Sequence, residues 1–149
     1  MKRIISIVLL FCFSTFFAIS AERVVVSEKL YLQLESNKFK RGDTVFFKGY
    51  LQNASAVAEE APSEFIYVEL LKPIHIDNPK EFDLVQRVKV KRNGLESDSE
   101  FGDFKIFNGY IKIPAELKNG QYLLRAYTRW QLNFPLQYLF NCAINIGDR

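Results

Sequence analysis

Short strand-like segments separated by turn residues recur along this 149-residue chain, and they constrain its fold more than any other feature. In most of them apolar residues alternate with polar ones, which is typical of strands with one buried face, and one is almost continuously apolar, as in a central strand. Glycine, proline and asparagine separate the segments. The pattern indicates no helix and predicts seven strands, at 29–34, 44–52, 64–71, 84–92, 104–113, 121–128 and 136–146.

Seven short strands favour an all-β fold, and specifically an immunoglobulin-like antiparallel β-sandwich; a closed barrel is the alternative. Tyr122 lies just inside the penultimate strand, after Gly120, and this predicts a tyrosine corner in which its hydroxyl binds the preceding connection. Asn93 and Gly94 predict a hairpin turn. Pro73 is expected to end its strand, and a turn is expected at 77–81.

The first 20 residues have the pattern of a secretory signal peptide. Lys2 and Arg3 precede a mostly apolar run at 4–19, and small residues around Ser20 suit a cleavage site. The run has about 16 residues, fewer than the roughly 18 to 20 that a membrane-spanning helix needs. We therefore expect a signal peptide at 1–20, a single domain at 21–149, no transmembrane segment after cleavage, and a periplasmic or secreted location.

Charge and cysteine content narrow the function further. Cleavage would remove two of the 20 basic residues and none of the 17 acidic ones, which leaves a net charge of +1. The charge therefore gives no argument for binding nucleic acid or an anionic membrane. Cys142 would be the one remaining cysteine, so the domain could form no intrachain disulfide. We expect Cys142 to be a small buried core residue.

No catalytic, cofactor-binding or metal-binding residues stand out. His75 is the single histidine and has no neighbouring cysteine. The Arg-Gly-Asp tripeptide at 41–43 is best explained as a turn that leads into a strand. The acidic stretch at 96–103 lacks the glycine and the final acidic residue that a calcium loop requires, so we expect a solvated loop. The sequence therefore predicts a protein that is not an enzyme.

One strand has an unusual outer face. Arg125, Tyr127 and Arg129 alternate with apolar and small residues at 124, 126 and 128, and Trp130 follows. One explanation is packing or domain docking, because arginine stacks on tyrosine across neighbouring strands. The other explanation is an interaction patch that receives a partner or an anionic glycan, since these residue types dominate interface energetics. The candidate patch consists of Arg125, Tyr127, Arg129 and Trp130.

Three segments together resemble a known family. They are EKLYLQLESNKFKRGDTVFFKGYL at 28–51, IYVELL at 66–71 and IPAELKNGQYLLRAYTRWQLNF at 113–134. They look like the macroglobulin-like domain found second in alpha-2-macroglobulin proteins, in the version present in cell-envelope proteins of Gram-negative bacteria. The chain departs from that pattern at 35–38, where the acidic residue and proline-containing turn are replaced, and at 77–107, which is longer than expected.

The resemblance implies an immunoglobulin-like macroglobulin fold and a non-catalytic structural or protein-interaction role in the bacterial envelope. The implied partner is another envelope protein or a neighbouring domain; the oligomeric state stays open. Full inhibitors of this family carry a reactive Cys-Gly-Glu-Gln thioester, and this sequence has no such tetrapeptide. The chain is expected to be a free-standing module or the front piece of a longer arrangement. A component of a protease-inhibitor system and a carbohydrate-binding module are the alternatives.

Overall fold

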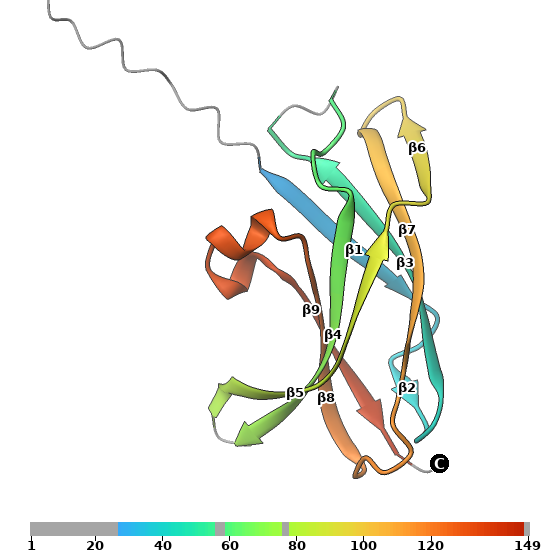
Figure 1. The fold of residues 1–149 in the computed structure, drawn as a ribbon, viewed down its shortest axis with the longest axis vertical. Helices are drawn as coiled ribbons and strands as arrows, with labels where there is room; N and C mark the ends of the chain where they lie inside the picture. Colours follow the sequence, from blue (N-terminus) through green and yellow to red (C-terminus); the bar gives the residue numbers. More distant parts are fainter. Residues whose placement is uncertain (1–26, 56–58, 76–77, 148–149) are drawn as a thin grey trace, which may run out of the picture.

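The computed structural model describes residues 27–55, 59–75 and 78–147, which form two β-sheets around a shared core (Figure 1). In the described part no strand pairs across the two sheets, so the predicted sandwich is confirmed and the barrel is not. The strands are β1 (Glu28–Leu34), β2 (Lys38–Phe39), β3 (Thr44–Asn53), β4 (Phe65–His75), β5 (Asn78–Lys91), β6 (Gly94–Asp98), β7 (Gly102–Lys112), β8 (Gly120–Tyr127) and β9 (Phe140–Ile146). Two 3-10 helices, η1 (Trp130–Asn133) and η2 (Leu136–Tyr138), lie between β8 and β9.

The first sheet has the order β1-β3-β7-β6, and the second has the order β2-β9-β8-β4-β5. All neighbours are antiparallel except β2 and β9, which pair in parallel. Alternate residues of both sheets point into the core, as expected for period-two strands. Fully buried members include Val45, Leu51, Phe107 and Ile111 from the first sheet, and Ile66, Val68, Leu70, Leu124 and Ile144 from the second.

Two strands were missed by the sequence pattern. β2 has only two residues, and β6 is an exposed edge strand made largely of polar residues. Because β6 buries no face, its sequence lacks apolar alternation, and the solvated acidic loop expected at 96–103 was partly wrong: 94–98 pair with β7. Asp98 caps the turn that follows, since its Oδ1 accepts the N–H groups of Glu100 and Phe101 at 2.8 and 2.9 Å.

The predicted hairpin turn at Asn93 and Gly94 was also wrong. These residues carry the chain from β5 in the second sheet to β6 in the first, so the strands on either side do not pair with each other. The amide of Asn93 bonds the backbone of Asn108 on β7 instead, with Nδ2 donating to its carbonyl at 3.2 Å and Oδ1 accepting its N–H at 3.0 Å. The asparagine thus serves the crossover rather than a tight turn.

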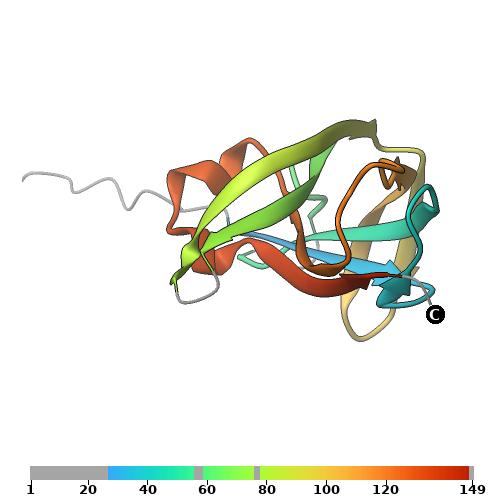
Figure 2. The same ribbon diagram turned by 90° about the horizontal axis from the view of Figure 1, so that it is seen from below.

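The long hairpin of β4 and β5 runs past the positions where proline was expected to stop it, and its strands lie side by side in Figure 2. Pro73 lies within β4 and pairs with Phe82, next to a register irregularity. The ladder between β4 and β8 already ends at Leu71, so Pro73 lies where β4 has one partner strand and a missing N–H is tolerated. The turn expected at 77–81 was wrong over 78–81, which belong to β5.

Several local predictions are confirmed. The Tyr122 hydroxyl donates to the carbonyl of Lys118 at 2.9 Å, which is the predicted tyrosine corner. The Arg-Gly-Asp tripeptide forms a turn in which Gly42 has φ +83°, a value that favours glycine. Gly109 lies within β7, and a Cβ at this position would lie 2.7 Å from the Phe47 ring. The glycine therefore makes room for a core aromatic.

Cys142 was expected in the buried core but is only half-buried. It lies on β9 opposite Leu124, and together with Leu32 and Leu34 of β1 it lines a surface hollow of about 400 Å³.

The expected start of the last strand at 136 was wrong, since 136–138 form η2. The predicted signal peptide at 1–20 lies outside the described residues. Within the described residues, no helix has the length and apolar character needed to span a membrane.

Candidate functional site

The four residues of the candidate patch do not share one surface. Arg125 and Tyr127 lie on the outer face of the second sheet, within β8. Arg129 precedes η1 and Trp130 is its first residue, so both lie beyond the end of the strand. The period-two row predicted from the sequence therefore ends after Tyr127, and the residues divide into a sheet pair and a turn pair.

Tyr127 belongs to a buried cluster around Glu69. The register of β4 places Glu69 between Arg87 on β5 and Arg125 on β8. Glu69 is only 5% exposed, although it lies on the outer face. Its Oε1 accepts hydrogen bonds from Arg87 Nε and from the Tyr127 hydroxyl, both at 2.7 Å. The ring of Tyr67 stacks on Tyr127 with centroids 5.6 Å apart, so the cluster covers the carboxylate.

Burial changes the chemistry of this cluster. Desolvation, together with the hydrogen bond to Glu69, raises the pKa of Tyr127 to about 12. The bond to Glu69 also raises the pKa of the Arg87 guanidinium. Both effects favour the protonated donors that hold the carboxylate. The arrangement is that of a satisfied ion pair within a sheet.

Arg125 is held by its own neighbours. Its Nε donates to Oδ1 of Asn141 on β9 at 2.9 Å. Its guanidinium carbon lies 5.5 Å from the ring centroid of Phe82 on β5, a cation–π distance. Arg125 thus connects three strands of the second sheet. These contacts agree with the packing explanation for Arg125 and Tyr127.

A buried hydrogen-bond network fixes the turn after β8. The Thr128 hydroxyl donates to Oε2 of Glu28 at 2.5 Å, and Ser63 donates to the same carboxylate through its N–H and hydroxyl at 2.8 Å. Gln131 Nε2 donates to the Glu28 carbonyl at 3.1 Å, while its Oε1 accepts the Thr128 N–H at 2.9 Å. The first and third of the family-like segments therefore meet here, at Glu28 and Thr128.

The segment held by this network exposes four large apolar side chains. We call Trp130, Leu132, Leu136 and Tyr138 the η1–η2 surface; their exposed fractions are 40, 52, 54 and 65%. The ring centroids of Trp130 and Phe134 lie 6.2 Å apart at an interplanar angle of 66°. Sequence reasoning found Trp130 but missed the other three. Leu136 and Tyr138 were taken as the start of a strand, and nothing in the local pattern marked Leu132 as exposed. Pro135, which interrupts the apolar alternation, was the available signal.

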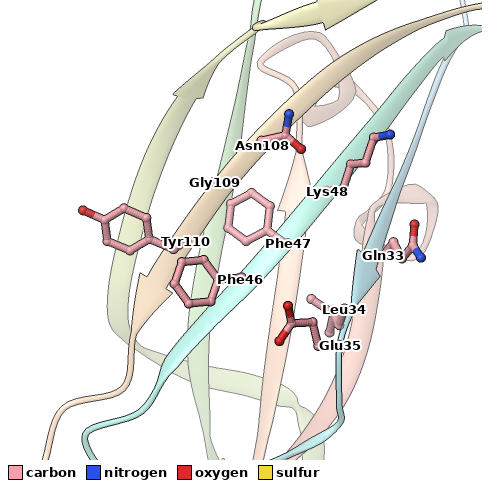
Figure 3. Close-up of a pocket in the computed structure, with 9 residues that line it drawn as sticks. All are labelled: Gln33, Leu34, Glu35, Phe46, Phe47, Lys48, Asn108, Gly109 and Tyr110. Atoms are coloured by element: carbon pink, nitrogen blue, oxygen red, sulfur yellow. The ribbon is translucent and has the colours of Figure 1, made fainter. Parts of the chain in front are cut away.

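The outer face of the first sheet carries a shallow hollow of about 570 Å³, shown in Figure 3. The rings of Phe46 and Tyr110 are part of its lining, at a centroid distance of 6.0 Å and an interplanar angle of 52°. Such tilted rings do not form the flat platform on which a sugar ring stacks. Lys48, at the rim, pairs with Glu96 at 2.5 Å.

The described residues contain no group of three or more His, Cys, Asp or Glu side chains that could hold a metal ion. His75 ends β4, but its side chain lies outside the part that the structure describes. Cys142 donates weakly to the carbonyl of Ala143 at 3.6 Å. The acidic residues at 96–103 do not gather into a calcium loop, since Asp98 caps a turn and Glu96 binds Lys48.

No family model matches the sequence, and a search of curated proteins finds no significant match. Solved structures do match. Salmonella alpha-2-macroglobulin reacted with methylamine superposes on 83% of this chain with a TM-score of 0.57 and 15% identity. The native conformation of Escherichia coli alpha-2-macroglobulin matches 84% of the chain with a TM-score of 0.56 and 15% identity.

The chain shares its fold with part of the bacterial alpha-2-macroglobulins. The trypsin-activated E. coli protein gives a third match, with a TM-score of 0.55 and 14% identity over 81% of the chain. The chain spans only 6 to 7% of the length of these three proteins. The macroglobulin-like fold agrees with the sequence resemblance, and at this identity the likeness is one of fold.

Proposed function

We propose that the chain is a non-catalytic, exported macroglobulin-like module of the bacterial envelope, with a signal peptide at 1–20 and a domain at 21–149. In this proposal the module docks on another envelope protein or a neighbouring domain through the η1–η2 surface. The three family-like segments and the shared fold support the module. The periplasmic or secreted location rests on the sequence of the first 20 residues.

One observation carries the docking role: four large apolar side chains are exposed on a segment that is fixed at both ends. At its start, Gln131 and Thr128 are tied to Glu28 by the buried network. At its end, Asn141 Nδ2 donates to the carbonyl of Leu139 at 2.9 Å. Apolar clusters exposed on an ordered segment are typical of protein-binding surfaces, because the ordering entropy is already paid.

Two of the four residues of the candidate patch take part in the proposed docking. Trp130 belongs to the surface, and Arg129 lies beside it as an exposed rim residue. Arg125 and Tyr127 make contacts within the second sheet and are not part of the η1–η2 surface. Protease trapping by this chain alone is not proposed, since it has no Cys-Gly-Glu-Gln tetrapeptide and spans a small part of the alpha-2-macroglobulins it matches.

The proposal is tested by affinity purification of the tagged protein from its own cell envelope, read by mass spectrometry. Three proteins are compared: the unchanged chain, the triple variant L132S/L136S/Y138S, and the control F46S/L84S/L95S. The control removes apolar side chains of similar exposure from other strands. Circular dichroism first verifies that all three are folded.

We expect one envelope protein at a stoichiometric ratio with the unchanged chain and the control, and its loss with the η1–η2 variant. A partner that the η1–η2 variant retains would contradict the docking surface. A glycan array with the same three proteins addresses the carbohydrate-binding alternative. If the unchanged chain binds a glycan, and F46S/L84S/L95S loses this binding while L132S/L136S/Y138S keeps it, the carbohydrate-binding function would replace the docking proposal.

A further inference from the structure

The strand β7 has two halves with different edges. Toward β3 it is paired over almost its whole length, from Phe104 to Lys112. On the opposite edge β6 covers only its first half, and that ladder ends where Gly94 meets Ile106. Among the described strands, none pairs with 109–112 on this edge. The outer edge of the first sheet is therefore formed by β6 along the first half of β7 and by β7 itself along the second half.

Directly after the end of the β6 ladder, the side chain of Asn93 takes the place of a strand partner for Asn108. By bonding both the N–H and the carbonyl of Asn108, it imitates one residue of a neighbouring strand. Residues along a strand alternate in the edge to which their backbone groups point. Tyr110 and Lys112 therefore direct their N–H and carbonyl groups to the same edge as Asn108, where no described strand receives them.

A groove of about 580 Å³ lies along this unpaired edge, between β7 and β5. Val88 and Val90 line it from β5; both pack against the core yet remain half-buried because no strand covers them here. Lysines lie along the groove at 89 and 91 on β5 and at 112 on β7, and none of the described residues that line it is acidic. The groove thus combines free backbone groups, an apolar floor and positive charge.

We propose that this groove binds an acidic extended segment of another protein chain, which adds as a strand to the free edge of β7. Such a segment would place alternate apolar side chains over Val88 and Val90, and the acidic side chains between them near the lysines. Backbone pairing gives it an orientation, and the charge selects acidic over basic segments. The groove shares no residue with the η1–η2 surface, so this proposal stands apart from the docking role.

The test uses protein purified from expression of the full-length chain, studied by NMR. The probe is a blocked peptide of alternating valine and glutamate. One control peptide has lysine in place of glutamate, and a second keeps the acidic sequence but carries N-methyl groups on alternate residues, which prevents pairing on one edge. Backbone signals and hydrogen exchange are followed at Tyr110 and Lys112.

The protein variants separate charge from folding. K91E/K112E reverses two lysines of the groove, and K29E/K118E makes the same change in net charge at exposed lysines elsewhere. Lys89 is left unchanged because its ammonium already lies 4.1 Å from the centroid of the Phe65 ring.

We expect the acidic peptide to slow exchange at the Tyr110 and Lys112 amides. We also expect its binding to weaken about tenfold or more in K91E/K112E, and to be unchanged in K29E/K118E. The lysine peptide and the N-methylated peptide should bind much more weakly. Equal binding of the acidic and N-methylated peptides would overturn strand addition, and equal binding of the acidic and lysine peptides would overturn acidic selectivity. Unaltered exchange at saturating acidic peptide would overturn the site.

Discussion

The strand β8 and the segment that follows it have similar residues and opposite environments. In β8, Tyr127 is buried against Tyr67 and Glu69. In the segment that follows, Trp130 and Tyr138 are exposed to solvent. Arginine, tyrosine and tryptophan are the residues most enriched at interface hot spots, yet here their type does not separate the two roles. What separates them is whether a neighbouring strand supplies a partner.

The largest expected effect on the unfolding free energy comes from a comparison of two aromatic truncations, one in β8 and one in the segment that follows it. Tyr127→Ala removes a buried ring and the donor to Glu69, and we expect it to lower the free energy of unfolding by about 3 to 5 kcal/mol. Trp130→Ala should lower it by about 1 kcal/mol or less, because its ring is partly exposed. Urea unfolding measures both. Equal losses would show that the turn is packed as tightly as the strand.

Thr128 stands at the boundary between the two regions. Thr128→Val removes the donor to Glu28 and the acceptor of the Gln131 N–H, so we expect a loss of about 1 to 2 kcal/mol in unfolding free energy. Thr44→Val, at the start of β3, is the matched control and should change stability by less than about 0.5 kcal/mol. If the two variants matched, the network would not be what fixes the turn.

The buried phenol of Tyr127 predicts that the unfolding free energy depends on pH in the alkaline range. The pKa of Tyr127 is raised to about 12 in the folded protein, above the value near 10 of an unfolded chain. The folded state therefore holds the proton more tightly, so this stabilisation is complete below pH 10 and is lost as the pH rises toward 12. Urea titrations between pH 9 and pH 12 should show a steeper fall for the unchanged protein than for Tyr127→Phe. Parallel curves would contradict the assignment.

The smallest effects concern the two arginines. Arg125→Ala breaks the bond to Asn141 and the contact with Phe82, and we expect a loss of about 0.5 to 1 kcal/mol, since the side chain is partly exposed. Arg129→Ala should change the unfolding free energy by less than about 0.5 kcal/mol, because the side chain is exposed beyond the sheet. Thermal or urea unfolding of the two single variants compares them directly; a larger loss at Arg129 would reverse the comparison.

The sequence predicted the sandwich because most strands bury one face and thus show period-two alternation. It missed β6, where Glu96 and Asp98 leave nothing apolar to alternate, and it stopped β4 at Pro73, since an open sheet edge cannot be read from one strand. The turn at Asn93 was misread for a related reason. A hairpin and a crossover between sheets use the same residue types, and only the pairing of distant strands distinguishes them.

The candidate site was predictable only in outline. The alternation placed Arg125 and Tyr127 correctly on an outer face, but the burial of Tyr127 depends on Glu69 and Tyr67, which lie about 60 residues earlier in the chain. The exposure of Leu132 and Leu136 was not visible, because apolar residues usually indicate core. The local sequence pattern predicts on which face of a strand a residue lies. Whether that residue is buried depends on tertiary contacts.

Site-specific photo-crosslinking in the native cell tests the central claim most directly. A photoreactive residue is placed at Leu132 or Leu136 in the η1–η2 surface, and at Arg125 or Leu123 on the outer face of the second sheet. We predict that the first two positions give a cross-linked product with the same envelope protein and that the sheet positions give none. A product formed from the sheet face alone would contradict the account and return the interaction patch to Arg125 and Tyr127.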